Sequence, residues 1–326
     1  MINLFRRLNP FNLFILLPFL IVLRIAFLLR LPAHLEFNFA ELFGRLLLSL
    51  PRESVFSPVQ DITVTLFIVF LQGIILNRII NIHNLLGKPS FMPALMYGTV
   101  TSIFFPFLVL TPALICNFLI IWMIERFLTI YGRTEALSVM FDMGIIVGVG
   151  TLIYFPFIGF FLLLWISLII FRPFNWREWI AGLIGFVTVY FFLGVYYYWK
   201  NAFGDFFNIF LPLTSKFPAS IKINLNDYTV LIPLIAILIF SGFTIRQNFF
   251  RSYVHVRRSF QLLFFCFVLA MISFYLKPQV RVYHFLMATA PVSLFMSYYF
   301  LHAKKRWIYE SLYFSLIVFI IYFQIV

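Results

Sequence analysis

The sequence predicts an all-α protein, a polytopic transmembrane helix bundle of about 11 spans with its N-terminus inside and its C-terminus outside. Its 326 residues are 63% hydrophobic and 11% charged, whereas a soluble domain carries about 25% charged residues. Apolar runs recur at lengths suited to a hydrocarbon core of about 30 Å. Lys and Arg are more frequent in every second connection between these runs, as expected of connections on the cytoplasmic side. We expect the whole chain, 1–326, to form a single integral membrane domain.

Eleven apolar runs are long enough, or nearly long enough, to cross the bilayer. They cover 11–31, 62–82, 93–112, 113–130, 139–153, 157–171, 178–198, 229–245, 259–276, 282–301 and 308–325. The stretch 139–171 has two interpretations, one long tilted helix or a hairpin broken at 154–156. Pro156 lacks a backbone donor and clashes with the preceding turn, which favours the break.

The distribution of Lys and Arg independently supports the hairpin. With eleven spans and an inside N-terminus, the inner segments hold 15 of the 24 Lys and Arg and the outer segments hold 8, while Arg24 lies within the first span. If 139–171 formed one span, every later connection would lie on the other side of the membrane, with 11 Lys and Arg inside and 12 outside. Because cytoplasmic loops carry the excess of positive charge, the hairpin is preferred.

Composition also restricts the partners that we expect. The net charge of +13 fits the anchoring of cytoplasmic loops, and no basic run interleaved with aromatics suggests nucleic acid. The two cysteines, Cys116 and Cys266, both lie in apolar runs, which is typical of small buried side chains. We expect no metal and no cofactor.

The first apolar run could be a cleaved signal peptide or a retained span. Arg6 and Arg7 precede it, but no A-x-A-like cleavage site follows it, so we interpret this run as a retained span.

The segment 172–179 (RPFNWREW) combines three charges with two tryptophans between apolar runs. Such a segment is either a chemical site or a turn at the membrane surface. Trp176 and Trp179 suit the headgroup layer, and Glu178 would open the next helix, where the helix dipole favours a negative charge. We therefore predict a turn.

Two outer loops are predicted at 32–61 and 199–228. The first contains an apolar stretch, 39–48, that could form a short helix lying in the interface. The second begins in a Tyr/Trp cluster, 196–199.

Two clusters on the outer side carry the candidate chemistry. Glu36 and Glu41 follow the first span, and such acids could supply a general base or a metal ligand; a solvated loop is the alternative. Lys277, Arg281 and His284 at the start of the tenth span, with Arg30 at the end of the first, could hold a lipid phosphate or diphosphate. Simple anchoring at the interface is the alternative for this second cluster.

Three further features of the spans have open interpretations. Arg24 inside the first span either marks a functional interior or extends to the surface. Asp142 either caps a helix or faces an inner cavity, and the glycines at 144–150 suit close helix packing or a binding role. Acidic residues deep within the spans are otherwise missing, which disfavours a proton- or sodium-coupled transporter.

The segments 141–144, 151–156, 172–179 and 185–190 resemble an uncharacterised family of bacterial polytopic inner-membrane proteins. This resemblance implies a multi-pass protein of the bacterial inner membrane and carries no assigned activity.

More distantly, the layout resembles the GT-C superfamily of membrane glycosyltransferases. The resemblance implies that Glu36 or Glu41 is the catalytic acidic residue and that Lys277 and Arg281 hold a polyprenyl-phosphate-linked sugar. The chain lacks that superfamily's acidic pair directly after the first span and its periplasmic domain.

The leading functional hypothesis is thus a GT-C-like enzyme or relative acting on lipid-linked sugars at the outer leaflet, in contact with membrane lipids. A second hypothesis is a non-catalytic membrane subunit of an envelope or secretion complex, whose partners are other membrane proteins. A lipid or small-solute transporter is the weakest, because polar residues in the spans are few.

Overall fold

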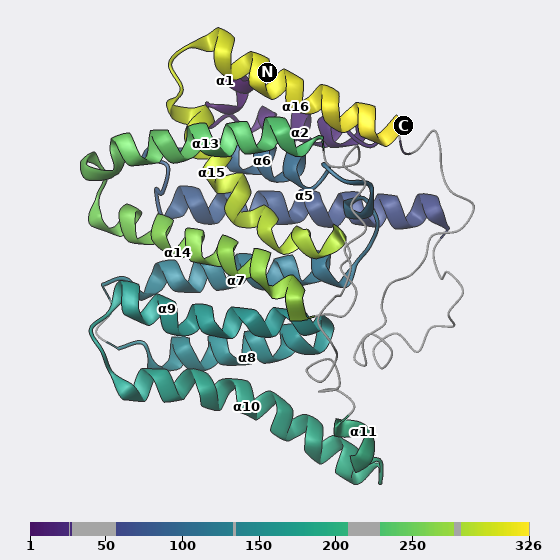
Figure 1. Ribbon diagram of the computed structural model, residues 1–326, viewed down its shortest axis with the longest axis vertical. Helices are drawn as coiled ribbons and strands as arrows, with labels where there is room; N and C mark the ends of the chain where they lie inside the picture. The colour runs from purple at the N-terminus through teal and green to yellow at the C-terminus, as the bar shows by residue number, and fades with distance from the viewer. Residues whose placement is uncertain (26, 28–56, 133–134, 208–228, 277–281, 326) are drawn as a thin grey trace.

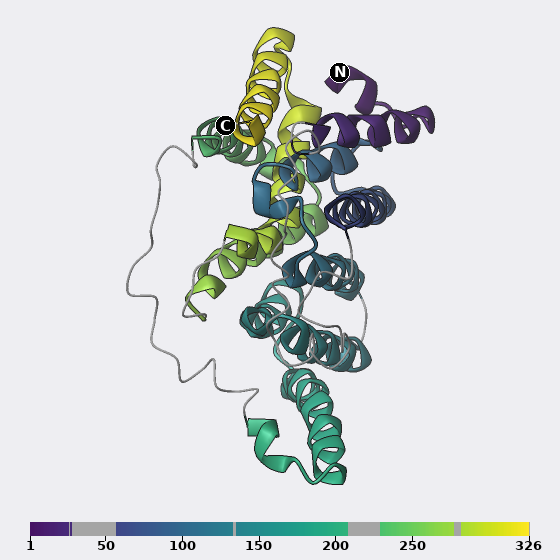
Figure 2. The ribbon, with the colours of Figure 1, turned by 90° about the vertical axis from the view of Figure 1, so that its right-hand side faces the viewer.

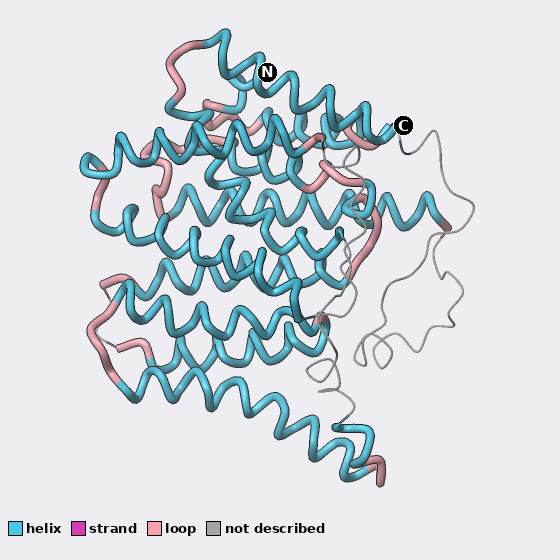
Figure 3. Tube along the Cα trace, in the orientation of Figure 1, coloured by secondary structure: helices cyan, strands magenta, loops and turns pink. Residues whose placement is uncertain are grey.

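The computed structural model describes residues 1–25, 27, 57–132, 135–207, 229–276 and 282–325, and all regular structure in these residues is helical (Figures 1 and 3). Seven of the described helices are long and apolar enough to cross a membrane. Most helices run roughly along one direction, and Figure 2, which views many of them nearly end-on, shows an elongated cross-section. The all-α fold is therefore confirmed, and its helices suggest a membrane protein.

The longer helices are α5 (Pro58–Ile82), α7 (Pro112–Ile130), α8 (Leu137–Ile153), α10 (Trp176–Trp199), α13 (Leu231–Asn248), α14 (Val254–Ile272), α15 (Thr289–His302) and α16 (Arg306–Ile325). The shorter α-helices are α1 (Ile2–Phe5), α2 (Phe11–Val22), α6 (Met92–Val100), α9 (Phe161–Phe171) and α11 (Phe203–Phe207). Short 3-10 helices are η1 (Phe105–Phe107), η2 (Phe155–Phe160), η5 (Phe249–Arg251), η6 (Ser273–Leu276) and η7 (Val282–Ala288).

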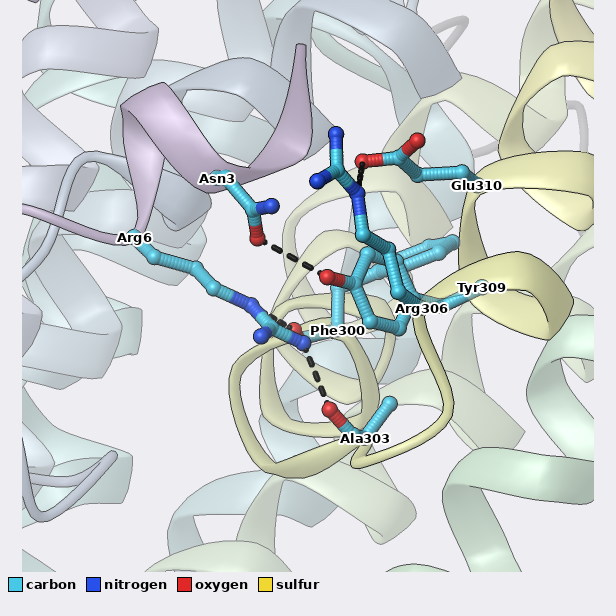
Figure 4. A network of polar contacts seen from close by, with 7 residues as sticks. All are labelled: Asn3, Arg6, Phe300, Ala303, Arg306, Tyr309 and Glu310. Carbon is cyan, nitrogen blue, oxygen red and sulfur yellow. Dashed lines mark hydrogen bonds and ion pairs between the residues drawn. The ribbon is translucent and has the colours of Figure 1, made fainter.

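The N-terminus and several turns lie at one end of the bundle, which we call the amino-terminal end. Arg6 after α1 donates from Nε to the carbonyl oxygen of Phe300 at 2.8 Å and from Nη2 to that of Ala303 at 2.7 Å (Figure 4). Its guanidinium also lies 4.2 Å from the Tyr309 ring centroid, and Tyr309 donates to Asn3. A cation at the C-terminus of α15 complements the helix dipole, so the N-terminal segment fastens the α15–α16 turn.

The ends of helices distant in the sequence meet at this same end. Tyr131 after α7 lies 5.0 Å from His255 in α14 and 6.4 Å from Phe171 in α9, measured between ring centroids. His83 after α5 stacks on His255 at 6.2 Å. The turns α5–α6, α7–α8, α9–α10, α13–α14 and α15–α16 therefore lie at the amino-terminal end.

The opposite end of the bundle holds the other described connections. The Leu110 amide donates to Asp61 in α5, and Gln324 in α16 donates to the Ser102 carbonyl. Tyr154, between α8 and η2, contacts His284 in η7. Successive helical segments thus lead alternately from one end of the bundle to the other.

Several predicted boundaries need correction. The break at 154–156 is confirmed, because α8 ends at Ile153 and η2 begins at Phe155. The run 93–112 is not one helix: α6 ends at Val100, and Pro106 lies in the separate η1, since proline cannot continue the helical ladder. The predicted loop 32–61 extends too far, because α5 begins at Pro58 with a Ser57–Gln60 capping box.

The predicted turn at 172–179 is confirmed. Helix α9 ends at Phe171, and the Asn175 side chain caps α10 by accepting from the Arg177 amide. Buried Glu178 pairs with Arg172 at 3.0 Å and accepts from the Ala136 amide at 3.2 Å. Glu178 thus satisfies the N-terminus of α8, a role that Asp142, six residues into that helix, does not have.

Helices α8 and α10 pack backbone to backbone through glycines. A Cβ on Gly144 would lie 2.1 Å from the Gly182 carbonyl oxygen, and one on Gly185 would lie 2.1 Å from that of Phe141. A Cβ on Gly148 would meet Val189 at 2.9 Å. The glycines at 144–150 therefore serve close packing, as small residues commonly do between membrane helices.

Candidate functional site

A buried arginine lies at the opposite end, where α2 has ended. Arg24 follows the turn after Val22 and is 0% exposed. Its Nη1 donates to the Ile62 carbonyl oxygen at 3.4 Å, a long hydrogen bond, while Nε and Nη2 have no partner. An unpaired cation in the interior of a bundle of apolar helices is energetically costly, and buried charged residues of this kind are typical of functional interiors.

The first turns of α5 bring two more unsatisfied groups to this region. Asp61 is 0% exposed; its Oδ2 accepts from the Leu110 amide at 3.2 Å, and its Oδ1 has no partner. Thr65, one turn further along α5, has a buried hydroxyl without a partner. Arg24 forms no ion pair with Asp61. This end of the bundle therefore contains a buried donor and a buried acceptor whose hydrogen-bonding capacity is unused.

His284 lies in the interior at the same end and is 2% exposed. Its Nε2 lies 3.2 Å from the Ala270 carbonyl oxygen and 3.2 Å from Ser273 Oγ, and its Nδ1 lies 2.8 Å from the Tyr154 hydroxyl. A carbonyl oxygen only accepts, so Nε2 carries the proton and Nδ1 accepts from Tyr154. The imidazole is thus oriented by three other segments of the chain.

The η1 segment connects these two polar groups. Phe105 packs edge-on against Phe27, close to Arg24 in the sequence, with ring centroids 4.3 Å apart. The same short helix packs against η7, which carries His284. Irregular backbone is tolerated at membrane depth where protein buries it or where it lines a cavity. The breaks at η1, η2, η6 and η7 therefore fit an interior built for polar contacts.

Deeper in the bundle, further polar side chains form hydrogen bonds between helices, although Asn117 Oδ1 has no partner. Tyr97 donates to Gln72 Oε1 at 2.8 Å, and Gln72 Nε2 donates to the Leu114 carbonyl oxygen at 2.8 Å. Asn117 donates to the Thr289 hydroxyl at 3.2 Å. Hydrogen bonds of this kind hold membrane helices together, so we assign these residues to packing.

An apolar groove of about 410 Å³ lies on the side of the bundle, and one of its lining residues contacts His284. It is lined by residues of η2, α9, α10, α14 and η6, namely Ile158, Gly159, Phe161, Leu162, Leu183, Phe186, Leu269, Ile272, Ser273, Tyr275 and Leu276. Ser273 belongs both to this lining and to the contacts of His284. The groove is thus adjacent, through Ser273, to the polar interior around His284.

Most of the predicted site residues, Glu36, Glu41, Arg30, Lys277 and Arg281, lie outside the described residues. His284 is described, and it points into the bundle instead of lying at the surface.

Four polar residues of this end were not predicted from the sequence: Asp61, Thr65, Tyr154 and Ser273. The capping box at 57–60 was the available signal for Asp61, because it places that residue inside a helix. Thr65 becomes recognisable only through the burial of its hydroxyl, and Tyr154 and Ser273 only through their contacts with His284.

The chemistry available here is polar recognition. The free N–H groups of Arg24 suit a phosphate or carboxylate oxygen, and Asp61 offers an acceptor for a hydroxyl or amide. Within the described parts of the chain, no group of three or more His, Cys, Asp or Glu side chains could hold a metal ion.

The apolar helices suggest the class of this all-α protein, a membrane protein. The chain belongs to a family of unknown function, DUF6427, whose model matches residues 42–326. Helices α1 and α2, with Arg24, precede the matched region. Neither a curated protein nor a solved structure matches the chain.

Proposed function

We propose that this chain is a multi-pass protein of the bacterial inner membrane that acts at the outer leaflet on polyprenyl-phosphate-linked sugars, as a GT-C-like glycosyltransferase or relative. The amino-terminal end would face the cytoplasm and the opposite end would face outward, with eleven crossings. The connections alternate between the two ends of the bundle, which supports this count. The connections at the amino-terminal end carry the excess of Lys and Arg, which supports the orientation.

Arg24 is the observation that carries the proposal. A buried guanidinium with two unpartnered nitrogens is suited to bind a phosphate oxygen, which forms short, charge-assisted hydrogen bonds. Lipid acyl chains offer no negative charge to neutralise such a cation. The phosphate of a substrate would supply that charge.

The lateral groove supports a lipid-linked substrate. Its walls are apolar, so a polyprenyl chain could occupy it from the bilayer, and one of its lining residues, Ser273, contacts His284. Lys277 and Arg281 follow η6 directly in the sequence, and with Arg30 they would hold the phosphate. His284, already engaged with Tyr154, would act as a positioning residue for this segment. Glu36 or Glu41 would be the base.

The test replaces both glutamates by glutamine (Glu36→Gln with Glu41→Gln) in a strain that lacks the native copy, and assays surface glycans. We expect the glycans to be lost while the protein is still produced and extracted at the level of the wild type. The control is Glu310→Gln, which removes a partly exposed acid at the amino-terminal end. Wild-type glycans in the double variant would refute the catalytic role.

A second candidate function, a non-catalytic subunit of a membrane complex, is favoured by the surface of α10. This helix forms one edge of the bundle (Figure 1), and its aromatic side chains Phe191, Phe192, Tyr198 and Trp199 are exposed. Lipid or a partner helix could cover this face. Affinity purification in mild detergent tests the role, and the recovery of no stable partner would count against it.

A further inference from the structure

The α13–η5–α14 hairpin is strongly basic at the amino-terminal end. Between 229 and 272 the chain contains no Asp or Glu. The basic residues of this stretch, Arg246, Arg251, His255, Arg257 and Arg258, all lie near the turn. Clusters of this kind at a membrane surface attract anionic headgroups.

A second apolar groove, of about 360 Å³, adjoins the turn of this hairpin. Its lining comes from α13, η5, α14 and α15 and comprises Leu238, Gly242, Ile245, Phe249, Phe260, Gln261, Phe264, Phe265, Phe267 and Phe295. Exposed Phe264 and Phe265 place it on the outer surface of the bundle. A Cβ on Gly242 would meet nothing within 4 Å, so the space in front of this glycine is open.

Arg257 stands where the basic turn and the groove meet. Its guanidinium lies 5.6 Å from the ring centroid of Phe249, which lines the groove. The Arg257 Nε is buried and has no hydrogen-bond partner. Its neighbour Arg258, in contrast, donates to the Phe171 carbonyl oxygen and lies over the Tyr131 ring. Arg257 therefore combines an unused buried donor with a contact to the groove lining.

We propose that this groove is a binding site for one anionic phospholipid, with an acyl chain along α13 and α14 and its phosphate held by Arg257. The apolar lining suits the chain, and the absence of acidic residues in the hairpin suits a negative headgroup. Gln261, one turn after Arg257, offers an amide for the glycerol region. This site lies at the end of the bundle away from the proposed catalytic region and is independent of it.

Native mass spectrometry of the protein in mild detergent tests the site. The probes are dioleoyl phosphatidylglycerol, which is anionic, and dioleoyl phosphatidylethanolamine, which has no net charge. We expect tighter binding of the anionic lipid and about a tenfold loss of this affinity in Arg257→Gln, since hydrogen bonds to charged groups are strong. The control Arg78→Gln, at an exposed arginine of α5 near the same end, should bind as the wild type does.

The groove itself is tested by Gly242→Leu, whose side chain would fill the open space, against Gly242→Ala, which leaves most of it free. We expect about a tenfold loss of bound phosphatidylglycerol in the leucine variant only, because the acyl chain loses its apolar contact area. Equal binding of both lipids, or unchanged binding in Arg257→Gln and Gly242→Leu, would overturn the proposal. A protein dimer that Gly242→Leu abolishes would also overturn it, since a second copy would then be the occupant.

Discussion

Glu178 shows how a single side chain fixes three segments at the amino-terminal end. Its carboxylate is 1% exposed and contacts both Arg172, before α10, and the backbone amide of Ala136, the N-cap residue of α8. Charge-assisted contacts at a helix N-terminus satisfy donors that the helix cannot satisfy itself. The turn at 172–179 is therefore a structural joint between α8, α9 and α10.

We expect Glu178→Gln to lower the free energy of unfolding by about 3 kcal/mol, because Arg172 would lose its buried partner. Thermal unfolding in detergent measures this loss. The matched control is Glu310→Gln, whose Arg306 partner is 73% exposed, and there we expect a change below about 1 kcal/mol. Equal effects of the two substitutions would contradict the structural role of Glu178.

His83 gives the amino-terminal end a dependence on pH. Burial lowers the pKa of His83, its neighbour His255 lowers it further, and Glu125 partly opposes this. Its folded-state pKa is below the ordinary value of 6.5, so the unfolded chain takes up the proton more readily. The stabilisation from neutral His83 is therefore complete above that value and is lost as the pH falls below it.

Melting temperatures between pH 7.5 and 5.5 check this effect. We expect the wild type to lose stability toward the acidic limit, and His83→Gln to lose less over the same range. A variant that loses as much stability as the wild type would show that His83 does not carry the effect.

At the scale of elements, the α8–α10 contact depends on the absence of side chains. We expect Gly185→Ala to lower the free energy of unfolding by about 3 kcal/mol, because the new Cβ would overlap the Phe141 carbonyl oxygen and force the helices apart. In Gly242→Ala, where space is open, we expect no loss and a gain of up to about 1 kcal/mol. Unfolding midpoints of the two variants compare them directly, and equal midpoints would exclude backbone contact as the reason for glycine.

The elements also show how far the sequence could predict the fold. Long apolar runs give helices because, in lipid, the backbone must satisfy its own hydrogen bonds; α7 and α10 accordingly begin and end within two residues of the predicted runs. Hydropathy alone does not register a break inside an apolar segment. Helix α6 therefore ends well before the end of its run, where η1 carries Pro106.

The candidate site was only partly predictable, for a different physical reason. A charge within an apolar run, such as Arg24, is visible in the sequence, but its unused donors depend on α5. His284 contacts Tyr154 across 130 positions of the chain, and no local pattern reports such a contact. The outer clusters around Glu36 and Lys277 remain predictions, since they lie outside the described residues.

For the whole molecule, the proposed topology has eleven helical segments that cross the membrane and leave the two chain ends on opposite sides. The most direct measurement compares fusions of green fluorescent protein and alkaline phosphatase after Asn175, in the α9–α10 turn, and after Val326. We predict fluorescence without phosphatase activity at Asn175, and phosphatase activity without fluorescence at Val326. Fluorescence at Val326 would place the C-terminus in the cytoplasm and exclude this topology.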